Sequence, residues 1–127
     1  MARRSIEIAS FTHQNPIPAA SRIGPLVVSS VISPYDPGTR DLPATIEAQL
    51  ANLFHHAGEI LDAADAGWDD VVRMTFFVRD LDHRAAINGP WLEHFPDPTS
   101  RPARHTQLVP AGPGPLVSCD LTAYVEP

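Results

Sequence analysis

Two arginines and a histidine lie in one short segment of the chain, residues 101–109, which reads Arg-Pro-Ala-Arg-His-Thr-Gln-Leu-Val. Proline-rich turns flank this segment on both sides, so it is predicted to be a strand that tight turns enter and leave. An arginine fixed on a rigid strand can hold both oxygens of one carboxylate, because its guanidinium is planar and presents paired N–H donors. Arg104 is therefore a candidate anchor for a small organic acid. The plainer interpretation is an ion pair on the surface or between subunits, since most charges on strands are solvated or paired.

The six histidines of the chain show no metal-binding pattern. His55 and His56 are neighbours on a predicted helix, so their side chains diverge by about 100° and cannot chelate one metal together. No ligand spacing such as HExxH surrounds the other histidines. Cys119 alternates with apolar residues and is expected to be an inert buried thiol. We therefore expect no metal and no cofactor. His105 could act as a general base by its type, or equally satisfy a turn or an ion pair.

Length and charge narrow the class of protein. The 127 residues are the size of one ordinary domain, so we expect a single domain over residues 1–127. The formal net charge is -6 with only 9 Lys and Arg, which argues against nucleic acid as a partner. A single cysteine rules out an internal disulfide and fits a reducing compartment. We see neither a secretory signal nor a segment long enough to cross a bilayer, so a cytoplasmic protein without a membrane partner is expected.

Hydrophobic periodicity predicts strands and two helices in an alternating order. The predicted strands cover residues 5–9, 22–32 with a turn at Gly24-Pro25, 71–80, 101–109 and 116–125. The clearest helix has Pro43 in its first turn, Asp41 as its cap and Gly67 as its left-handed stop. A second helix, at about 82–95, is expected to kink or to split at Gly89-Pro90.

The predicted strand at residues 71–80 has one apolar and one mixed face. Its apolar face should meet the helices and consists of Val72, Met74, Phe76 and Val78. Its other face places Phe77 among Val71, Arg73, Thr75 and Arg79. A large aromatic residue on a polar sheet face indicates that a second protein surface covers part of it. We therefore expect a two-layer α+β domain whose helices cover one face of the sheet and whose other face packs against copies of itself.

Four passages resemble the RidA/YjgF family, and together they span nearly the whole chain in the right order. Residues 23–30 followed by 36–39 resemble "VGNLVFTSG…DPxTG", and residues 49–78 resemble "Q…NL…IL..AG…DDVVK.TVFV". Residues 86–95 resemble "AVNEVYGEYF", and Pro102-Ala103-Arg104 resembles "PAR". The set of four is specific, although each passage alone is short.

The resemblance implies a chorismate-mutase-like fold: a mixed β-sheet with two helices on one face, assembled as a homotrimer with an inner β-barrel and pockets between subunits. It also implies hydrolysis of reactive 2-enamine and 2-imino acids to 2-keto acids and ammonia. Arg104 matches the arginine that holds the substrate carboxylate, and Asn88 matches an asparagine that we interpret as structural rather than catalytic. Thr106 replaces a cysteine, Ile17 lies near the place of a missing tyrosine, and Ser30 completes the implied substrate-binding positions.

Members of the family resembled here carry a glutamate on the last strand that organises the attacking water. Aligned on residues 117–123, its position holds Ser118, and the next acid in phase is Asp120. A carboxylate there could take a proton from water or relay one, whereas serine binds water but is a poor base unless another base activates it.

The expected function is therefore that of a RidA-like deaminase, with Arg104 as anchor and Asp120 or Ser118 placing the water. The alternative is a non-catalytic protein that binds small keto acids or related metabolites in the same pocket. The acidic balance and the lack of a basic stripe argue against a third interpretation, an endoribonuclease.

Overall fold

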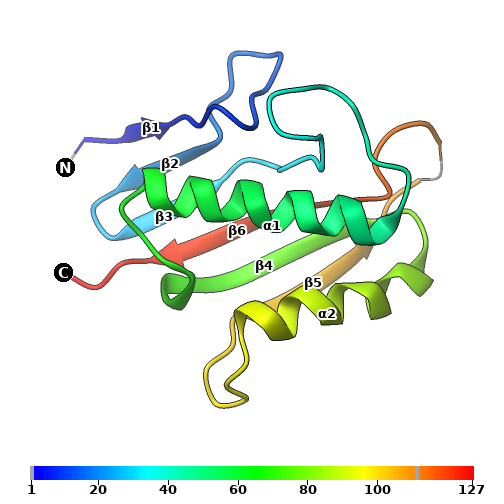
Figure 1. Cartoon of the computed structure of the whole chain (residues 1–127). Coiled ribbons are helices and arrows are strands. Elements are labelled where there is room, and N and C mark those ends of the chain that lie inside the picture. Colours follow the sequence, from blue (N-terminus) through cyan, green and yellow to red (C-terminus); the bar gives the residue numbers. More distant parts are fainter. Residues whose placement is uncertain (1, 111) are drawn as a thin grey trace.

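The computed structural model describes residues 2–110 and 112–127. Within these residues, six strands form one sheet and two helices pack on one of its faces (Figure 1). The strands are β1 Arg4–Ile6, β2 Ala20–Ile23, β3 Leu26–Ser29, β4 Val71–Val78, β5 Ala103–Leu108 and β6 Val117–Tyr124. The helices are α1 Ile46–Ala63 and α2 Arg84–His94, each next to a short 3-10 helix, η1 Trp68–Asp70 and η2 Leu81–His83 respectively. The predicted two-layer α+β architecture is confirmed.

The order of the strands is β1-β2-β3-β6-β4-β5, so the last strand of the chain lies inside the sheet. The pairing of β4 with β5 is parallel, whereas the pairings of the other neighbouring strands are antiparallel. A parallel pair needs a crossover connection, and α2 supplies it. As a consequence, the strand that carries Arg104 lies at an edge of the sheet, with β4 as its neighbour on one side.

Helix α1 is shorter than predicted at both ends. Thr45, rather than Asp41, is its N-cap and accepts a hydrogen bond from the backbone N–H of Ala48 at 3.2 Å. Both residue types can cap a helix, but the backbone of Asp41 is already bonded to the preceding loop. The left-handed residue after the helix is Asp65, with φ 59°, whereas Gly67 is extended with φ -137°. The predicted cap at Asp41 and stop at Gly67 are therefore wrong.

Helix α2 runs through Gly89 and Pro90 as one continuous helix, so the predicted split into two pieces is wrong. A proline inside a helix has no N–H and removes one hydrogen bond to the carbonyl four residues earlier. In α2 this carbonyl belongs to Ala86, which lacks its usual helical donor as a result. The remaining helical hydrogen bonds and the packing of α2 against α1 hold the eleven-residue helix together.

Strand β4 contains an irregularity near its start that changes which side chains face the core. The register shifts between Val71 and Arg73, so that Val71 is buried and Val72 is 53% exposed. An extra residue in a strand flips the preceding side chains to the other face of the sheet. The predicted inward position of Val72 is therefore wrong, although Met74 and Phe76 are buried as expected.

The predicted turn at Gly24-Pro25 is confirmed. Strand β1 is shorter than expected, because its pairing with β2 stops at residue 6.

His56 of α1 is fully buried, which the apolar stripe of the helix did not predict. Its Nε2 lies 2.7 Å from the backbone carbonyl of Tyr35, and its Nδ1 lies 3.1 Å from the Ser10 hydroxyl. A carbonyl can only accept, so the neutral ring carries its proton on Nε2 and accepts the Ser10 O–H at Nδ1. The histidine thereby joins the N-terminal loop and the loop before α1 to the helix.

Protonation of His56 is expected to destabilise the fold. Burial lowers the pKa of His56 below its usual 6.5, and the hydrogen bond to the Tyr35 carbonyl offsets part of this. The unfolded chain then binds the proton at a higher pH than the folded chain. The free energy of unfolding should therefore be highest above pH 6.5 and fall as the pH drops from 6.5 through the lowered folded pKa.

Urea denaturation at several pH values on both sides of 6.5 measures this dependence. His56→Phe should give a flatter profile, with the remaining slope coming partly from His13, whose pKa burial also lowers. An unchanged slope in His56→Phe would show that other groups carry the pH dependence.

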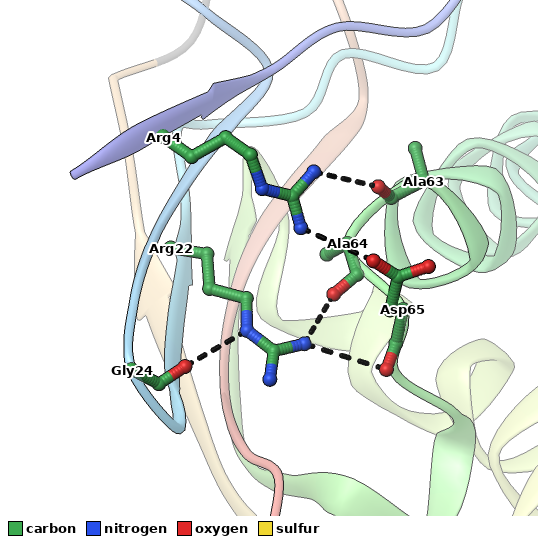
Figure 2. A network of polar contacts seen from close by, with 6 residues as sticks. All are labelled: Arg4, Arg22, Gly24, Ala63, Ala64 and Asp65. Carbon is green, nitrogen blue, oxygen red and sulfur yellow. Dashed lines mark hydrogen bonds and ion pairs between the residues drawn. The ribbon is translucent and has the colours of Figure 1, made fainter. Parts of the chain in front are cut away.

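Two arginines from the first strands close the C-terminal end of α1 (Figure 2). Arg22 of β2 donates from Nη1 to the backbone carbonyls of Ala64 and Asp65. Arg4 of β1 donates to the carbonyl of Ala63 and pairs with the Asp65 carboxylate at 3.3 Å. Cations at this end satisfy carbonyls that have no partner within the helix and complement its negative dipole end.

Arg22→Ala is expected to lower the free energy of unfolding by about 1–2 kcal/mol, because it leaves carbonyls at the helix end without a donor. Arg4→Ala is the matched control and should cost about 0–1 kcal/mol, since its ion pair is exposed. Urea denaturation of both variants measures the difference. Equal losses would contradict a special role for Arg22 in capping α1.

Candidate functional site

Arg104 lies on β5 beside α2, and three groups of that helix hold its side chain. Its Nη1 donates to Oδ1 of Asn88 at 2.9 Å, and its Nη2 donates to the backbone carbonyl of Arg84 at 3.3 Å. The guanidinium carbon also lies 5.3 Å from the ring centroid of Trp91, within cation–π distance. These contacts fix the orientation of the guanidinium at the edge of the sheet.

The partners of Arg104 leave its positive charge uncompensated. Within residues 2–110 and 112–127, no carboxylate forms an ion pair with it. A guanidinium has five N–H donors, and the hydrogen bonds to Asn88 and Arg84 use two of them. Partial burial lowers the pKa of Arg104, yet a guanidinium stays charged in proteins. A fixed charge with spare donors is what a bound carboxylate requires.

The register of the sheet places Thr106 on the same side as Arg104. Arg104 is paired with Met74 and Thr106 with Phe76 on β4, and both of these β4 side chains are buried on the helix side. Successive strand residues point to opposite faces, so His105 projects to the face away from the helices. The sequence-based prediction that Thr106 accompanies Arg104 while His105 points away is confirmed.

Ser118 and Asp120 lie on the opposite face of the sheet from Arg104. On β6, Ser118 is paired with Phe77 and Asp120 with Thr75, and both of these β4 residues alternate with the core residues Met74, Phe76 and Val78. Strand β4 also separates β6 from β5. Within one chain, the proposed water-activating residues therefore cannot face the same small molecule as Arg104.

Asp120 borders a hollow of about 200 Å³ on the open face of the sheet, together with Arg73, Thr75 and Thr122. Burial raises the pKa of the Asp120 carboxyl above its usual value, while the charge of Arg73 and hydrogen bonds from Thr75 act in the opposite direction. A carboxyl with a raised pKa is a stronger base once ionised. Such groups in hollows are candidates for proton transfer.

Ser30 and Ile17 lie on the β6 side of the molecule. The hydroxyl of Ser30 donates to the Pro18 carbonyl at 2.7 Å, so it is fixed next to Ile17, which is 45% exposed. The preceding Ser29, the last residue of β3, accepts a hydrogen bond from the backbone N–H of Leu121 at 2.9 Å, which places the end of β3 beside the middle of β6. These residues therefore neighbour the strand of Asp120 rather than the strand of Arg104.

The candidate residues thus form two separate groups in the chain. The group at β5 and α2 consists of Arg104, Thr106 and Asn88, and the group at β6 consists of Asp120, Ser118, Ser30 and Ile17. Sequence reasoning missed the contacts of Arg104 with Arg84 and Trp91. Their spacing from Asn88, at i−4 and i+3, would have placed all three on one face of a helix.

The remaining expectations concern metal sites, membrane-spanning helices and the thiol of Cys119. Within them, no three His, Cys, Asp or Glu side chains gather into a potential metal site, and neither helix combines the length and the apolarity to cross a bilayer. Cys119 is buried, and burial together with the nearby charge of Asp120 raises the pKa of its thiol. A thiol that stays protonated is a poor nucleophile, in agreement with the predicted inert role.

The chain matches the family model described as endoribonuclease L-PSP over residues 8–125. The chain belongs to the RidA/YjgF family. Among curated relatives, the RutC family protein of Haemophilus influenzae is 34% identical over 80 residues, which are 63% of this chain and 62% of that protein. The 2-iminobutanoate/2-iminopropanoate deaminase of Escherichia coli is 30% identical over 73 residues, which are 58% of this chain and 57% of that protein. The matches thus span about three fifths of the length of these relatives.

Solved structures of RidA/YjgF proteins share the fold over nearly the whole chain. RidA from an Antarctic Psychrobacter superposes with a TM-score of 0.87 at 26% identity, covering 96% of this chain and 99% of that chain. A Rid-family protein from Yersinia pestis has a TM-score of 0.88 at 28% identity, covering 98% and 100%. The predicted chorismate-mutase-like fold, a mixed sheet with two helices on one face, is confirmed.

Proposed function

We propose that this RidA/YjgF protein is a deaminase that hydrolyses 2-imino acids, and their 2-enamine tautomers, to 2-keto acids and ammonia. The observation that carries the proposal is the fixed guanidinium of Arg104, which has spare donors and no carboxylate partner in the described part of the chain. The deaminase named among its relatives supports the same class of substrate.

In the proposed reaction, Arg104 grips both carboxylate oxygens of the substrate and thereby positions the neighbouring imine carbon. Water adds to this carbon, forming a C–O bond while the electron pair of the C=N bond moves to nitrogen. One proton of the added water passes to the nitrogen and gives a carbinolamine. The remaining hydroxyl proton then passes to the nitrogen as the C–N bond breaks and the C=O bond forms, so that ammonia leaves with the keto acid. The step consumes one water and transfers no electrons to a cofactor.

We place the reaction between two copies of the chain, because one chain separates Arg104 from Asp120 by a strand and by the thickness of the sheet. Strand β5 offers an unpaired edge, which can pair with another chain. The open face of the sheet carries Leu26, Val28 and Tyr124, each more than two fifths exposed. Burying such an apolar patch favours association. A homotrimer with the sheets inside and the helices outside is the proposed assembly.

Asp120 is the proposed base that accepts a proton from the attacking water. Its raised pKa suits this role, whereas the hydroxyl of Ser118 would need a second base. In the proposed assembly, Ser30 and Ile17 of the same copy line the pocket wall next to Asp120. Thr106 and Asn88 of the other copy flank the carboxylate.

The experiment that tests the function is the release of pyruvate from freshly generated 2-aminoacrylate. We expect the protein to speed pyruvate and ammonia formation well above the rate in buffer. Titration with 2-oxobutanoate in parallel measures binding of a product-like keto acid. A rate equal to that of buffer, with 2-oxobutanoate still bound, would reject the deaminase and leave the non-catalytic binding protein.

A further inference from the structure

A groove of about 480 Å³ lies between α1 and α2, apart from the residues proposed above for catalysis. Its volume falls in the range of small-molecule sites. Six of its lining residues are apolar or small, and the other four are acidic residues or histidines. The first set is Leu50, Ala51, Phe54, Ala86, Gly89 and Pro90, and the second is Glu47, His55, Glu93 and His94.

The groove is open because α2 has Gly89 and Pro90 at the positions that face α1. Both residue types are unfavourable inside helices. The space where a side chain of Gly89 would begin is empty to 4 Å, so close packing does not require glycine there. Pro90 also leaves the carbonyl of Ala86, another lining residue, without its helical donor. These two residues thus leave a hollow and remove one helical hydrogen bond at the same place.

Most polar groups that line the groove can accept hydrogen bonds, whereas His55 pairs through its Nε2 with the Glu59 carboxylate at 3.1 Å. Glu47 and Glu93 are exposed, and their carboxylates have no ion-pair partner among the described residues. The Nδ1 of His94 lies 2.8 Å from the Pro90 carbonyl, so the neutral ring keeps its proton there and leaves Nε2 as an acceptor. The lining contains no lysine or arginine.

One wall of the groove is a fixed aromatic surface. The ring of His94 is stacked on Phe54 at a centroid distance of 4.6 Å and also lies 4.6 Å from Trp68. The hydrogen bond to the Pro90 carbonyl holds the His94 ring in this position. A flat apolar group could rest against this wall without reorganising it.

We propose that the groove binds a small organic cation with a planar apolar body, such as an arylalkylamine. The ammonium group donates to the carboxylate of Glu47 or Glu93. The ring lies on the apolar floor beside Phe54. This ligand has the opposite charge to the carboxylate substrate proposed for Arg104, so the two sites select different molecules.

Titration of the full chain with 2-phenylethylamine tests the proposal, with the indole N–H signal of Trp68 as the NMR reporter. We expect a saturable shift with a dissociation constant of roughly 1 mM, typical of a ligand of this size. The neutral analogue 2-phenylethanol has the same shape and should bind at least about tenfold more weakly, because it lacks the charge. Absence of saturation, or equal binding of the alcohol, would overturn the proposal.

Variants that fill the groove provide the matched control. Gly89→Leu fills it from α2 and Ala51→Phe fills it from α1, and each should abolish the saturable shift. Both positions are exposed, and circular dichroism verifies folding of each variant, so either one suffices if the other does not fold. Unchanged affinity in a folded variant of this kind would contradict the site. Arg104→Ala should leave the amine affinity unchanged, which separates this proposal from the deaminase function.

Discussion

Replacing Arg104 with alanine is expected to lower kcat/KM for 2-imino acids by about 10²–10³-fold, because two charge-assisted hydrogen bonds to the substrate carboxylate are lost. The affinity for 2-oxobutanoate should fall in parallel, since the keto acid presents the same carboxylate. Steady-state kinetics on freshly generated substrate and calorimetric titration of the keto acid measure the two losses.

Two further substitutions test whether geometry or charge alone holds the carboxylate. Arg104→Lys keeps the charge but not the planar pair of donors, so its affinity for 2-oxobutanoate should lie between that of Arg104→Ala and that of the wild type. Arg101→Ala is the matched control, because the Arg101 guanidinium binds the backbone carbonyls of Phe95 and Pro96. Equal keto-acid affinity in wild type, Arg104→Ala and Arg104→Lys would reject Arg104 as the anchor.

Mixing two inactive variants is expected to restore activity if each site takes residues from two copies of the chain. Asp120→Asn should lower kcat by about 10²-fold or more, since an amide cannot accept the proton from water. In assemblies formed at random from equal amounts of Arg104→Ala and Asp120→Asn, about one quarter of the sites would receive both intact residues. Activity should therefore rise far above that of either parent.

The mixture is prepared by joint unfolding and refolding, and keto-acid release is compared with that of each parent treated alone. A mixture of Arg104→Ala with the double variant Arg104→Ala/Asp120→Asn serves as control and should stay inactive. Mixed activity no higher than that of the parents would contradict a shared site, and sedimentation as a stable monomer would contradict the trimer.

Ser118→Ala should keep a deamination rate near that of the wild type. A loss as large as that of Asp120→Asn would move the water-activating role to Ser118.

Periodicity in the sequence was sufficient to predict the main elements. The apolar stripe of α1 and the alternation of β6 follow from burial on one face, which a local pattern records. The ends of α1 were not predictable in this way, because Thr45 and Asp41 are both competent caps and the loop contacts of Asp41 decide between them. Likewise, the shift between Val71 and Arg73 arises from pairing with β6, a partner distant in the sequence.

The candidate site was predictable in its parts but not in its arrangement. Strand alternation correctly placed Thr106 with Arg104 and turned His105 away. The separation of Arg104 from Asp120 depends on β4 lying between their strands and on its register with both of them. Long-range pairings of this kind leave no local periodic signal.

The one-sided pairing of β5 has a consequence for local opening of the fold. Its backbone is bonded to β4 on one side, so its outward amides should exchange with deuterium early in an isolated chain. If a neighbouring copy covers this edge, dilution that separates the copies should speed exchange in residues 103–108 while the central strand β6 stays protected. The protection of these few amides would then measure, residue by residue, how much of the protein is assembled at a given concentration.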